Sequence, residues 1–328
     1  MPVKQKAPKK KNVKKQKQDA NVHVNKNCEI FMCNMKEKID GKNEAQLMKE
    51  LEEIFRKTTS VSKKRIGDDS FNAFALILNG YHENRVVIKI PKKRDGSVDS
   101  LKYEYSMGCH LRKTLCKMLP NFMKVYGYIH KNDDEYLILQ RIMPGKTLRE
   151  LVKENPLPQF KSIRCKELMS IVLQTLCSIQ VAQNVVDFTH YDLHFGNIVI
   201  REDVNSPKEI KYTYHDRKNV THTVTVPIYD NRIAVIIDYG RTHTSKSPKF
   251  FTKNPECFNS YKFLIDKKRM PNIVDIRTFC SQYDTKRFCK ILDSYINNQE
   301  DFNYEFYEDL SEPHDVIKRL IKLSNKLK

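Results

Sequence analysis

One short string constrains the fold of this chain more than any other: His190-Tyr191-Asp192-Leu193-His194-Phe195-Gly196-Asn197. Before it lies a stretch whose apolar residues recur at helical spacing and which ends near Asp187. After it comes the apolar run Ile198-Val199-Ile200, which is typical of a buried strand. Packing needs alone rarely put this many polar residues at fixed positions between a core helix and a strand. The string therefore predicts a functional loop.

A second segment, Val235-Ile236-Ile237-Asp238-Tyr239-Gly240, is an apolar strand that brings an aspartate to its end. Asn197 ends the first string in the same way, directly before a strand. Carboxylate and amide oxygens at the rim of a small sheet are hard ligands of the kind that Mg²⁺ prefers. The two segments together predict a site that can hold this metal.

A third segment, Val86-Val87-Ile88-Lys89-Ile90, places a lysine inside an apolar strand, and Glu104 in the following helix could pair with it. Phosphoryl transfer from ATP needs a cation on the phosphates, metal ions, and a carboxylate that orients the acceptor. Lys89, Asn197, Asp238 and Asp192 supply these groups, so the sequence predicts a phosphotransferase.

The three segments resemble the catalytic loop (H-x-D-x-x-x-x-N), the metal-binding D-x-G and the V-A-I-K strand of the protein-kinase family, over about residues 60–285. The resemblance implies ATP and Mg²⁺ as cofactors. It also implies a role for each of ten residues. These are catalysis by Asp192 and His194, Mg²⁺ coordination by Asn197 and Asp238, and nucleotide binding by Gly67, Ser70, Lys89, Glu104, Gln140 and Ile142.

The order of elements predicts an α+β protein. Strand-like runs surround one helix at about 99–119, Pro144-Gly145 breaks the pattern, and the chain beyond is largely helical. The resemblance implies a bilobal kinase-like fold. We expect a small antiparallel-sheet lobe at 28–143 with a leading helix at 42–57, and a mainly helical lobe at 144–328. Alternating residues predict an inserted β-hairpin at about 205–230, near the cleft between the lobes.

The chain departs from the family in the glycine-rich loop. The best alignment, Ile66 to Phe74, keeps Gly67 and Ser70 but has Asp69 and Asn72 in place of the second and third glycines. Glycine lets backbone approach phosphates, whereas a carboxylate repels them. We therefore expect weakened ATP affinity.

Further departures bear on regulation and substrate. Tyr191 stands where many members have an arginine that reads an activation-loop phosphate, so that switch is not expected. His194 stands where serine/threonine kinases have lysine, and the loop is similar to those of aminoglycoside and choline kinases and of divergent kinases from large DNA viruses. Asp275 resembles the helix aspartate that supports the catalytic loop, and a simple N-cap or solvated acid fits it equally well.

The net charge is +19, and residues 1–27 contain nine lysines against Asp19 alone. Such a segment repels itself and has no apolar face to bury, which predicts a disordered basic tail. A solubilising extension, nuclear import, or nonspecific contact with nucleic acid or acidic partners all fit the tail. We see no apolar run that approaches the roughly 20 residues a membrane span needs, so no span is expected.

Nine cysteines without a C-x-x-C pair favour reduced thiols over disulfides or a zinc site. A cytoplasmic or nuclear location follows, or the host cell or virion if the protein is viral.

Three functions fit these observations. The leading one is a serine/threonine protein kinase that acts on acidic protein substrates. The second is a small-molecule kinase of the aminoglycoside or choline type, and the third is a pseudokinase that serves as a binding module.

Overall fold

The computed structural model describes residues 23–25, 28–33, 45–47, 49–50, 53, 63–66, 73–78, 86–91, 101–131, 134–154, 163–245, 280–296 and 312–326. Helical and strand elements are mixed and their strand pairings are antiparallel, so the α+β prediction is confirmed. Residues 45–47, 49–50 and 53 are helical and lie inside the helix predicted at 42–57. Gly67, Ser70 and Asp275 lie outside the described residues.

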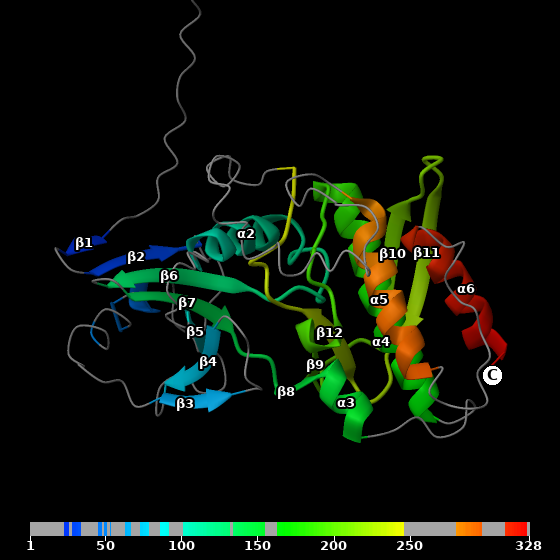
Figure 1. Cartoon of the computed structure of the whole chain (residues 1–328), viewed down its shortest axis with the longest axis horizontal. Helices are drawn as coiled ribbons and strands as arrows, with labels where there is room; N and C mark the ends of the chain where they lie inside the picture. Colours follow the sequence, from blue (N-terminus) through cyan, green and yellow to red (C-terminus); the bar gives the residue numbers. More distant parts are fainter. Residues whose placement is uncertain are drawn as a thin grey trace, which may run out of the picture.

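A seven-stranded sheet makes up the first part of the chain, in the order β1-β2-β6-β7-β5-β4-β3 (Figure 1). Its strands are β1 (His23–Asn25), β2 (Cys28–Met32), β3 (Lys63–Ile66), β4 (Ala73–Leu78), β5 (Val86–Pro91), β6 (Val125–Lys131) and β7 (Asp134–Gln140). The β-branched residues Val86, Val87 and Ile88 of β5 are buried, as suits a strand paired on both edges. Lys89 is thereby fixed in the interior of the sheet, opposite Leu137.

Helix α2 (Leu101–Thr114) packs against this sheet along a face that includes Glu104, Met107 and Leu111. These positions recur at helical spacing, so burial of the apolar pair also turns Glu104 inward. Gly108 permits the close approach, because a Cβ atom there would lie 2.0 Å from Val125 Cγ2. Helix packing therefore settles the direction in which Glu104 points.

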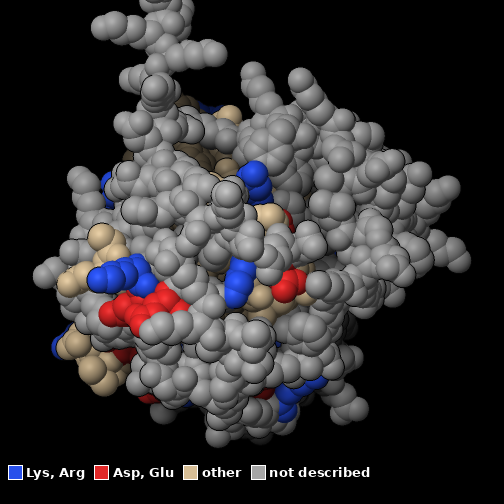
Figure 2. All heavy atoms as spheres, turned by 90° about the vertical axis from the view of Figure 1, so that its left-hand side faces the viewer, with Lys and Arg blue, Asp and Glu red and all other residues tan. Residues whose placement is uncertain are grey.

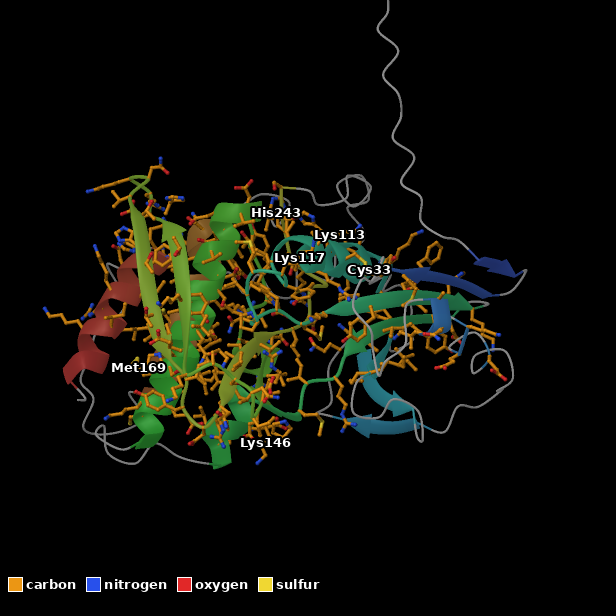
Figure 3. All side chains as sticks on the ribbon, turned by 180° about the vertical axis from the view of Figure 1, so that it is seen from behind. Cys33, Lys113, Lys117, Lys146, Met169 and His243 are labelled. Atoms are coloured by element: carbon orange, nitrogen blue, oxygen red, sulfur yellow. A yellow bond between two sulfur atoms is a disulfide. The ribbon has the colours of Figure 1, made fainter. Side chains whose placement is uncertain are left out.

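Cys33 and Cys109 form a disulfide between the end of β2 and α2, with their Cα atoms 5.2 Å apart (Figure 3). The expectation of reduced thiols is wrong for this pair. Sequence spacing gave no sign of it because 76 positions separate the two cysteines, and only the packing of α2 on the sheet brings them together. Cys116, Cys165, Cys177, Cys280 and Cys289 take part in no disulfide among the described residues.

Strand β1 lies inside the segment predicted as a disordered tail and pairs with β2. His23 and Val24 precede a single lysine there, so charge repulsion is weak at this end of the segment. Residues 1–22 lie outside the described residues. On the sheet side of the molecule, the described side chains include both basic and acidic groups (Figure 2).

The second part of the chain begins with β8 (Pro144–Thr147), so Pro144-Gly145 belongs to a strand that pairs with β9 (Ile198–Glu202). A three-stranded sheet has the order β12-β9-β8, with β12 at Arg232–Ile236. Helix α3 (Leu148–Glu154) starts with a capping box, in which Glu150 accepts from the Thr147 amide and Thr147 Oγ1 accepts from the Glu150 amide.

Helix α4 (Ile163–Val186) is the core helix of this part, and the predicted end near Asp187 agrees with it. Its segment Cys165–Val186 is long and apolar enough to cross a membrane by length and composition, contrary to our expectation that no such run exists. Most of that segment, 83%, is buried inside the protein. Burial within a protein core accounts for the same apolar composition.

The predicted hairpin is present as β10 (Glu209–His215) and β11 (Thr221–Pro227). It packs against α4 (Figure 1). Helix α6 (Pro313–Lys326) contacts both α4 and α5 (Ser281–Ile296). The inward residues Ile210, Tyr212 and Tyr214 are buried while their neighbours are exposed. The hairpin therefore covers the core helix α4, and no contact that the structure describes joins it to Lys89.

Several hydrogen bonds join the segment around β12 to α2 and to the chain that leads into β6. The Met123 amide donates to the Ile236 carbonyl at 3.0 Å, and the Ile236 amide donates to the Asn121 carbonyl at 2.7 Å. The Tyr103 hydroxyl of α2 donates to the Thr242 carbonyl at 2.5 Å. These contacts fix β12, and hence Asp238 just beyond it, relative to β5 and α2.

Candidate active site

Lys89 lies between two carboxylates from distant parts of the chain. Its Nζ atom is 2.6 Å from Glu104 Oε2 on α2 and 2.9 Å from Asp238 Oδ1 after β12. The Glu104 side chain is 2% exposed and that of Asp238 is 35% exposed. Glu104 is therefore enclosed by protein, whereas Asp238 still reaches solvent.

Burial and charge act in opposite directions on these three groups. Burial lowers the pKa of Lys89, but the charges of Asp238 and Glu104 outweigh it and raise this pKa above its usual value. Burial raises the pKa of Glu104 to about 6 despite the nearby ammonium group. Burial also acts to raise the pKa of Asp238, but Lys89 outweighs it and lowers this pKa to about 2. At neutral pH the cluster therefore contains one cation and two anions.

The loop from His190 to Asn197 is held by its own first residue. The His190 ring contacts the Ile237 carbonyl through Nε2 at 2.9 Å, and its Nδ1 accepts from the Asp192 amide at 3.2 Å. The ring thus joins the loop to the segment that carries Asp238. His190 is fully buried, which supports a structural role for it beneath the loop.

Asp284 of α5 holds the same loop from below. Its carboxylate accepts from the His190 amide at 2.5 Å and from the Tyr191 amide at 2.9 Å, and the side chain is buried. Tyr191 has φ of +60°, a left-handed conformation that costs energy in a non-glycine residue. The two hydrogen bonds to Asp284 offset that cost. Asp284 thus supports the backbone of this loop in the way that the family resemblance suggested for Asp275.

Asp192 lies between two arginines. Arg287 Nη2 is 2.8 Å from Asp192 Oδ1, and Arg241 Nη1 is 3.6 Å from Asp192 Oδ2. Arg287 also donates to the Tyr191 carbonyl at 3.0 Å, so one guanidinium holds both backbone and carboxylate. This arrangement fixes the direction of the Asp192 carboxylate.

Asn197 connects the loop to the Asp238 segment. Its side-chain Nδ2 donates to the Asp192 backbone carbonyl at 3.0 Å, and its backbone carbonyl accepts from the Ile237 amide at 3.0 Å. Since Nδ2 is used in this way, the side-chain oxygen Oδ1 remains as a possible ligand. A continuous series of contacts therefore links Lys89, Asp238, Asn197 and Asp192.

Asp238 and Asn197 offer the oxygen donors that suit Mg²⁺. Asp238 has φ of +67°, and such strain in a non-glycine residue often marks a functional position. Tyr239, which follows, is fully buried and donates its hydroxyl to the Met123 and Ile236 carbonyls at 3.0 Å each. This anchor holds the backbone beside Asp238 in place, so the donor set fits a metal site.

His194 lies beside Asp192, with Nε2 4.0 Å from Asp192 Oδ1. Its Nδ1 accepts from the Gly196 amide at 3.0 Å, which caps the short helix η1 (Phe195–Asn197). Burial lowers the pKa of His194 to about 4, so the ring is neutral at pH 7. A neutral ring with Nδ1 as acceptor carries its proton on Nε2, the atom that faces Asp192.

The two other described residues expected at the nucleotide are Gln140 and Ile142, at and just beyond the end of β7, the strand that pairs with β5. The Gln140 amide donates to the Lys124 carbonyl at 2.9 Å, and Gln140 Oε1 accepts from the Lys124 amide at 3.2 Å. Ile142 is buried in the main apolar cluster. The backbone amide and side-chain oxygen of Gln140 thus both bond to Lys124. No described contact joins Gln140 or Ile142 to Lys89, and their role at the nucleotide stays a prediction.

Sequence reasoning missed Asp284, Arg287 and Arg241. Arg241 directly follows Gly240, so its place beside the Asp238 segment was visible in the sequence. Asp284 and Arg287 are three positions apart on an amphipathic helix, where exposed acids and bases are common. Only the position of α5 beneath the loop distinguishes them.

Comparisons with known proteins give distant relatives, and no family model matches the chain. "Probable kinase 098L" of Invertebrate iridescent virus 3 is 25% identical over 48% of this chain and 29% of that protein. "Uncharacterized protein 179R" of Invertebrate iridescent virus 6 is 29% identical over 44% of this chain and 12% of that protein. "Probable serine/threonine-protein kinase fnkE" of Dictyostelium discoideum is 27% identical over 42% and 10%, respectively.

The chain thus spans less than a third of the length of each of these relatives. Among solved structures, "WaaP in complex with acyl carrier protein" is 12% identical with a TM-score of 0.33, over 81% of this chain and 89% of that one. That score is too low to support an argument. The resemblance to a divergent protein-kinase-like superfamily is confirmed by sequence relatives that are themselves named as kinases.

Proposed function

We propose that the protein is an ATP-dependent kinase with a bilobal kinase-like fold that transfers the γ-phosphate to a serine or threonine hydroxyl of a protein. The observation that carries the proposal is the contact of Lys89 with both Glu104 and Asp238. Holding the partly buried Lys89 ammonium against the buried Glu104 carboxylate costs free energy, because both charges lose hydration. A cation retained there despite that cost needs a functional explanation. Binding of nucleotide phosphates is such an explanation.

In the proposed reaction each residue of the chain has one task. Lys89 holds phosphate oxygens, and Glu104 fixes the direction of its ammonium group. Asp192 orients the acceptor hydroxyl and accepts its proton as the new oxygen–phosphorus bond forms and ADP departs. Asp238 and Asn197 would hold Mg²⁺, which neutralises charge on the phosphates when bound.

The arginines beside Asp192 support an acidic acceptor. Arg241 and Arg287 place two positive charges next to the carboxylate that would orient the hydroxyl. Positive charge there repels an amine-bearing acceptor such as an aminoglycoside or choline, and attracts acidic side chains that flank a serine or threonine. This observation favours the protein kinase over the small-molecule kinase.

Labelled phosphate tests the proposal. The chain, incubated with Mg²⁺ and γ-labelled ATP, is expected to label casein-like acidic proteins but not aminoglycosides or choline. Asp192→Asn should reduce the rate by about 10²- to 10⁴-fold. Asp230→Asn is the matched control, because Asp230 is exposed in a turn with φ of +50° that asparagine tolerates. Equal labelling by wild type and Asp192→Asn would contradict the proposal, and labelling of the small molecules alone would leave the small-molecule kinase.

A further inference from the structure

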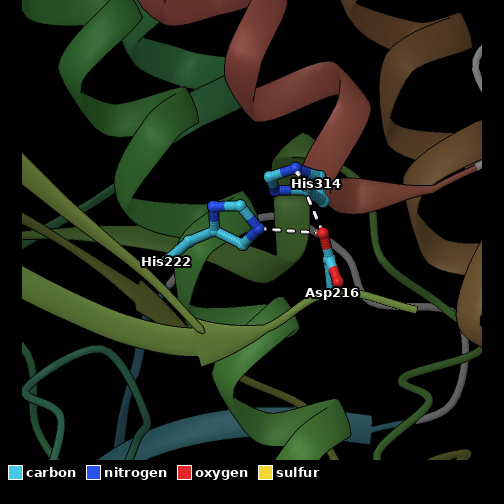
Figure 4. A group of neighbouring side chains, drawn as sticks. All are labelled: Asp216, His222 and His314. Atoms are coloured by element: carbon cyan, nitrogen blue, oxygen red, sulfur yellow. Dashed lines mark hydrogen bonds and ion pairs between the residues drawn. The ribbon is translucent and has the colours of Figure 1, made fainter. Parts of the chain in front are cut away.

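Three potential metal ligands meet at the far end of the β10–β11 hairpin, outside the kinase-like site (Figure 4). Asp216 opens the turn between the two strands, His222 lies on β11, and His314 lies in the first turn of α6. We propose that these three side chains bind a divalent transition-metal ion, for which Zn²⁺ is the natural probe. This inference does not depend on the proposed kinase function.

The geometry of the cluster suits one small ion. Asp216 Oδ2 is 2.9 Å from His222 Nε2 and 4.0 Å from His314 Nε2, and one ligand atom from each residue lies within 4.8 Å of the others. Bonds of about 2 Å in tetrahedral geometry separate neighbouring ligand atoms by roughly 3.3 Å. Small side-chain rotations would therefore bring all three atoms into coordination distance.

His314 supplies the second, independent observation. The residue is 7% exposed, and its Nε2 has no hydrogen-bond partner among the described residues. Leaving a buried polar nitrogen unsatisfied costs roughly 1–3 kcal/mol. This nitrogen points toward Asp216 (Figure 4). A metal ion bound there would satisfy it.

The surroundings of the cluster resemble the support that metal ligands usually have. The other nitrogen of His314, Nδ1, contacts the Tyr214 hydroxyl at 3.2 Å, which orients the ring. The other oxygen of Asp216, Oδ1, accepts from the Lys218 and Val220 amides at 2.9 Å each. His314 and Asp216 are therefore each held by one polar atom, and the other is left to face the centre.

A simple Asp–His contact explains the cluster less completely. It would pair Asp216 with His222 and leave the buried nitrogen of His314 unused. The two imidazole rings are 4.1 Å apart between centroids, so protonation of both would place like charges in contact. Neutral imidazoles that share a cation avoid this repulsion.

The donor set also selects the class of ion. Two imidazole nitrogens and one carboxylate suit Zn²⁺ and its first-row neighbours, whereas Mg²⁺ and Ca²⁺ prefer oxygen ligands alone. Three protein ligands leave a fourth position for water. A bound ion would cross-link α6 to the hairpin, which Arg217 and Glu312 already join by an ion pair.

Calorimetric titration of the full chain, after chelator treatment and dialysis, tests the proposal with Zn²⁺ itself. His314→Gln and His222→Gln should each weaken the affinity for Zn²⁺ at this site by on the order of 100-fold. His215→Gln is the matched control, because His215 is exposed on the same hairpin and outside the cluster. It should bind as wild type does.

Co²⁺ binding separates this site from cysteine sites by its visible spectrum. The proposal predicts a tetrahedral or five-coordinate nitrogen–oxygen spectrum that disappears in His222→Gln, a partly exposed position where loss of folding is not expected. Two results would overturn the proposal: Zn²⁺ stoichiometry and affinity unchanged by both cluster variants, or a Co²⁺ spectrum dominated by thiolate ligands that His222→Gln leaves intact.

Discussion

Lys89 and Glu104 form a contact of 2.6 Å between strand β5 and helix α2, and the Glu104 carboxylate is almost completely buried. The contact requires an ionised carboxylate, yet burial raises the pKa of Glu104 to about 6. The state of this pair therefore changes within an accessible pH range.

The first prediction concerns the affinity for Mg–ATP between pH 5 and 8. Below about pH 6 Glu104 gains a proton, its ion pair with Lys89 weakens, and Asp238 is left as the only anionic partner described for Lys89. The affinity for Mg–ATP should therefore fall. Glu104→Gln should have low affinity at all these pH values and no transition near pH 6. Titration calorimetry measures this, with Glu209→Gln, an exposed residue, as the control. A transition near pH 6 that survives in Glu104→Gln would assign it to another group.

The second prediction concerns Asp284, whose carboxylate accepts from the backbone amides of His190 and Tyr191 in the 190–197 loop. Asp284→Asn keeps one acceptor oxygen and places an NH₂ group against the other amide. We expect a loss of about 2–4 kcal/mol in the free energy of unfolding and a large loss of phosphate transfer. Urea denaturation measures the first effect.

Asp315→Asn is the control for Asp284, because Asp315 occupies the first turn of α6 and is exposed. Its stability should change by less than about 0.5 kcal/mol. If the two variants lost equal stability, Asp284 would have no special role beneath the loop.

The third prediction concerns the pH dependence of stability. The pKa of His194 is about 4 in the folded protein and about 6.5 when unfolded, so the unfolded chain takes up the proton first. The contribution of His194 is fully present above pH 6.5 and is lost as the pH falls toward 4. His194→Asn keeps an acceptor for the Gly196 amide and should flatten this part of the stability curve. If the free energy of unfolding of His194→Asn had the same slope against pH between 6.5 and 4 as that of the wild type, the pKa of His194 would not be shifted by folding.

The fourth prediction concerns the Cys33–Cys109 disulfide. Peptide mapping without reductant should find these two residues linked, and reduction should lower the stability of the chain by about 2–4 kcal/mol through a larger unfolded ensemble. Cys33→Ser should abolish the linked peptide, while Cys116→Ser, which removes a cysteine outside the disulfide, should leave it. Recovery of alkylated Cys33 and Cys109 from unreduced protein would contradict the prediction.

Local patterns in the sequence predicted much of the fold and part of the site. The segments around Lys89, Asp192 and Asp238 were visible because each joins an apolar strand or helix to polar residues within a few positions. The hairpin was visible from alternation. Its position against α4 was not, because alternation identifies a buried face and does not reveal which element covers it.

Contacts between distant segments could not be predicted in the same way. The support of the loop by Asp284 depends on the placement of α5, and the cluster of Asp216, His222 and His314 depends on the docking of α6 against the hairpin. In each case the residue types are ordinary and only tertiary packing brings them together.

The most direct test of the account measures Mg–ATP affinity and phosphate transfer in the same set of variants. Lys89→Met and Asp238→Ala should lose both, Asp192→Asn should keep affinity and lose transfer, and Lys211→Met, an exposed strand lysine, should keep both. This pattern would place Lys89, Asp238 and Asp192 in one nucleotide site with separate tasks. Unchanged Mg–ATP affinity in both Lys89→Met and Asp238→Ala would contradict the account.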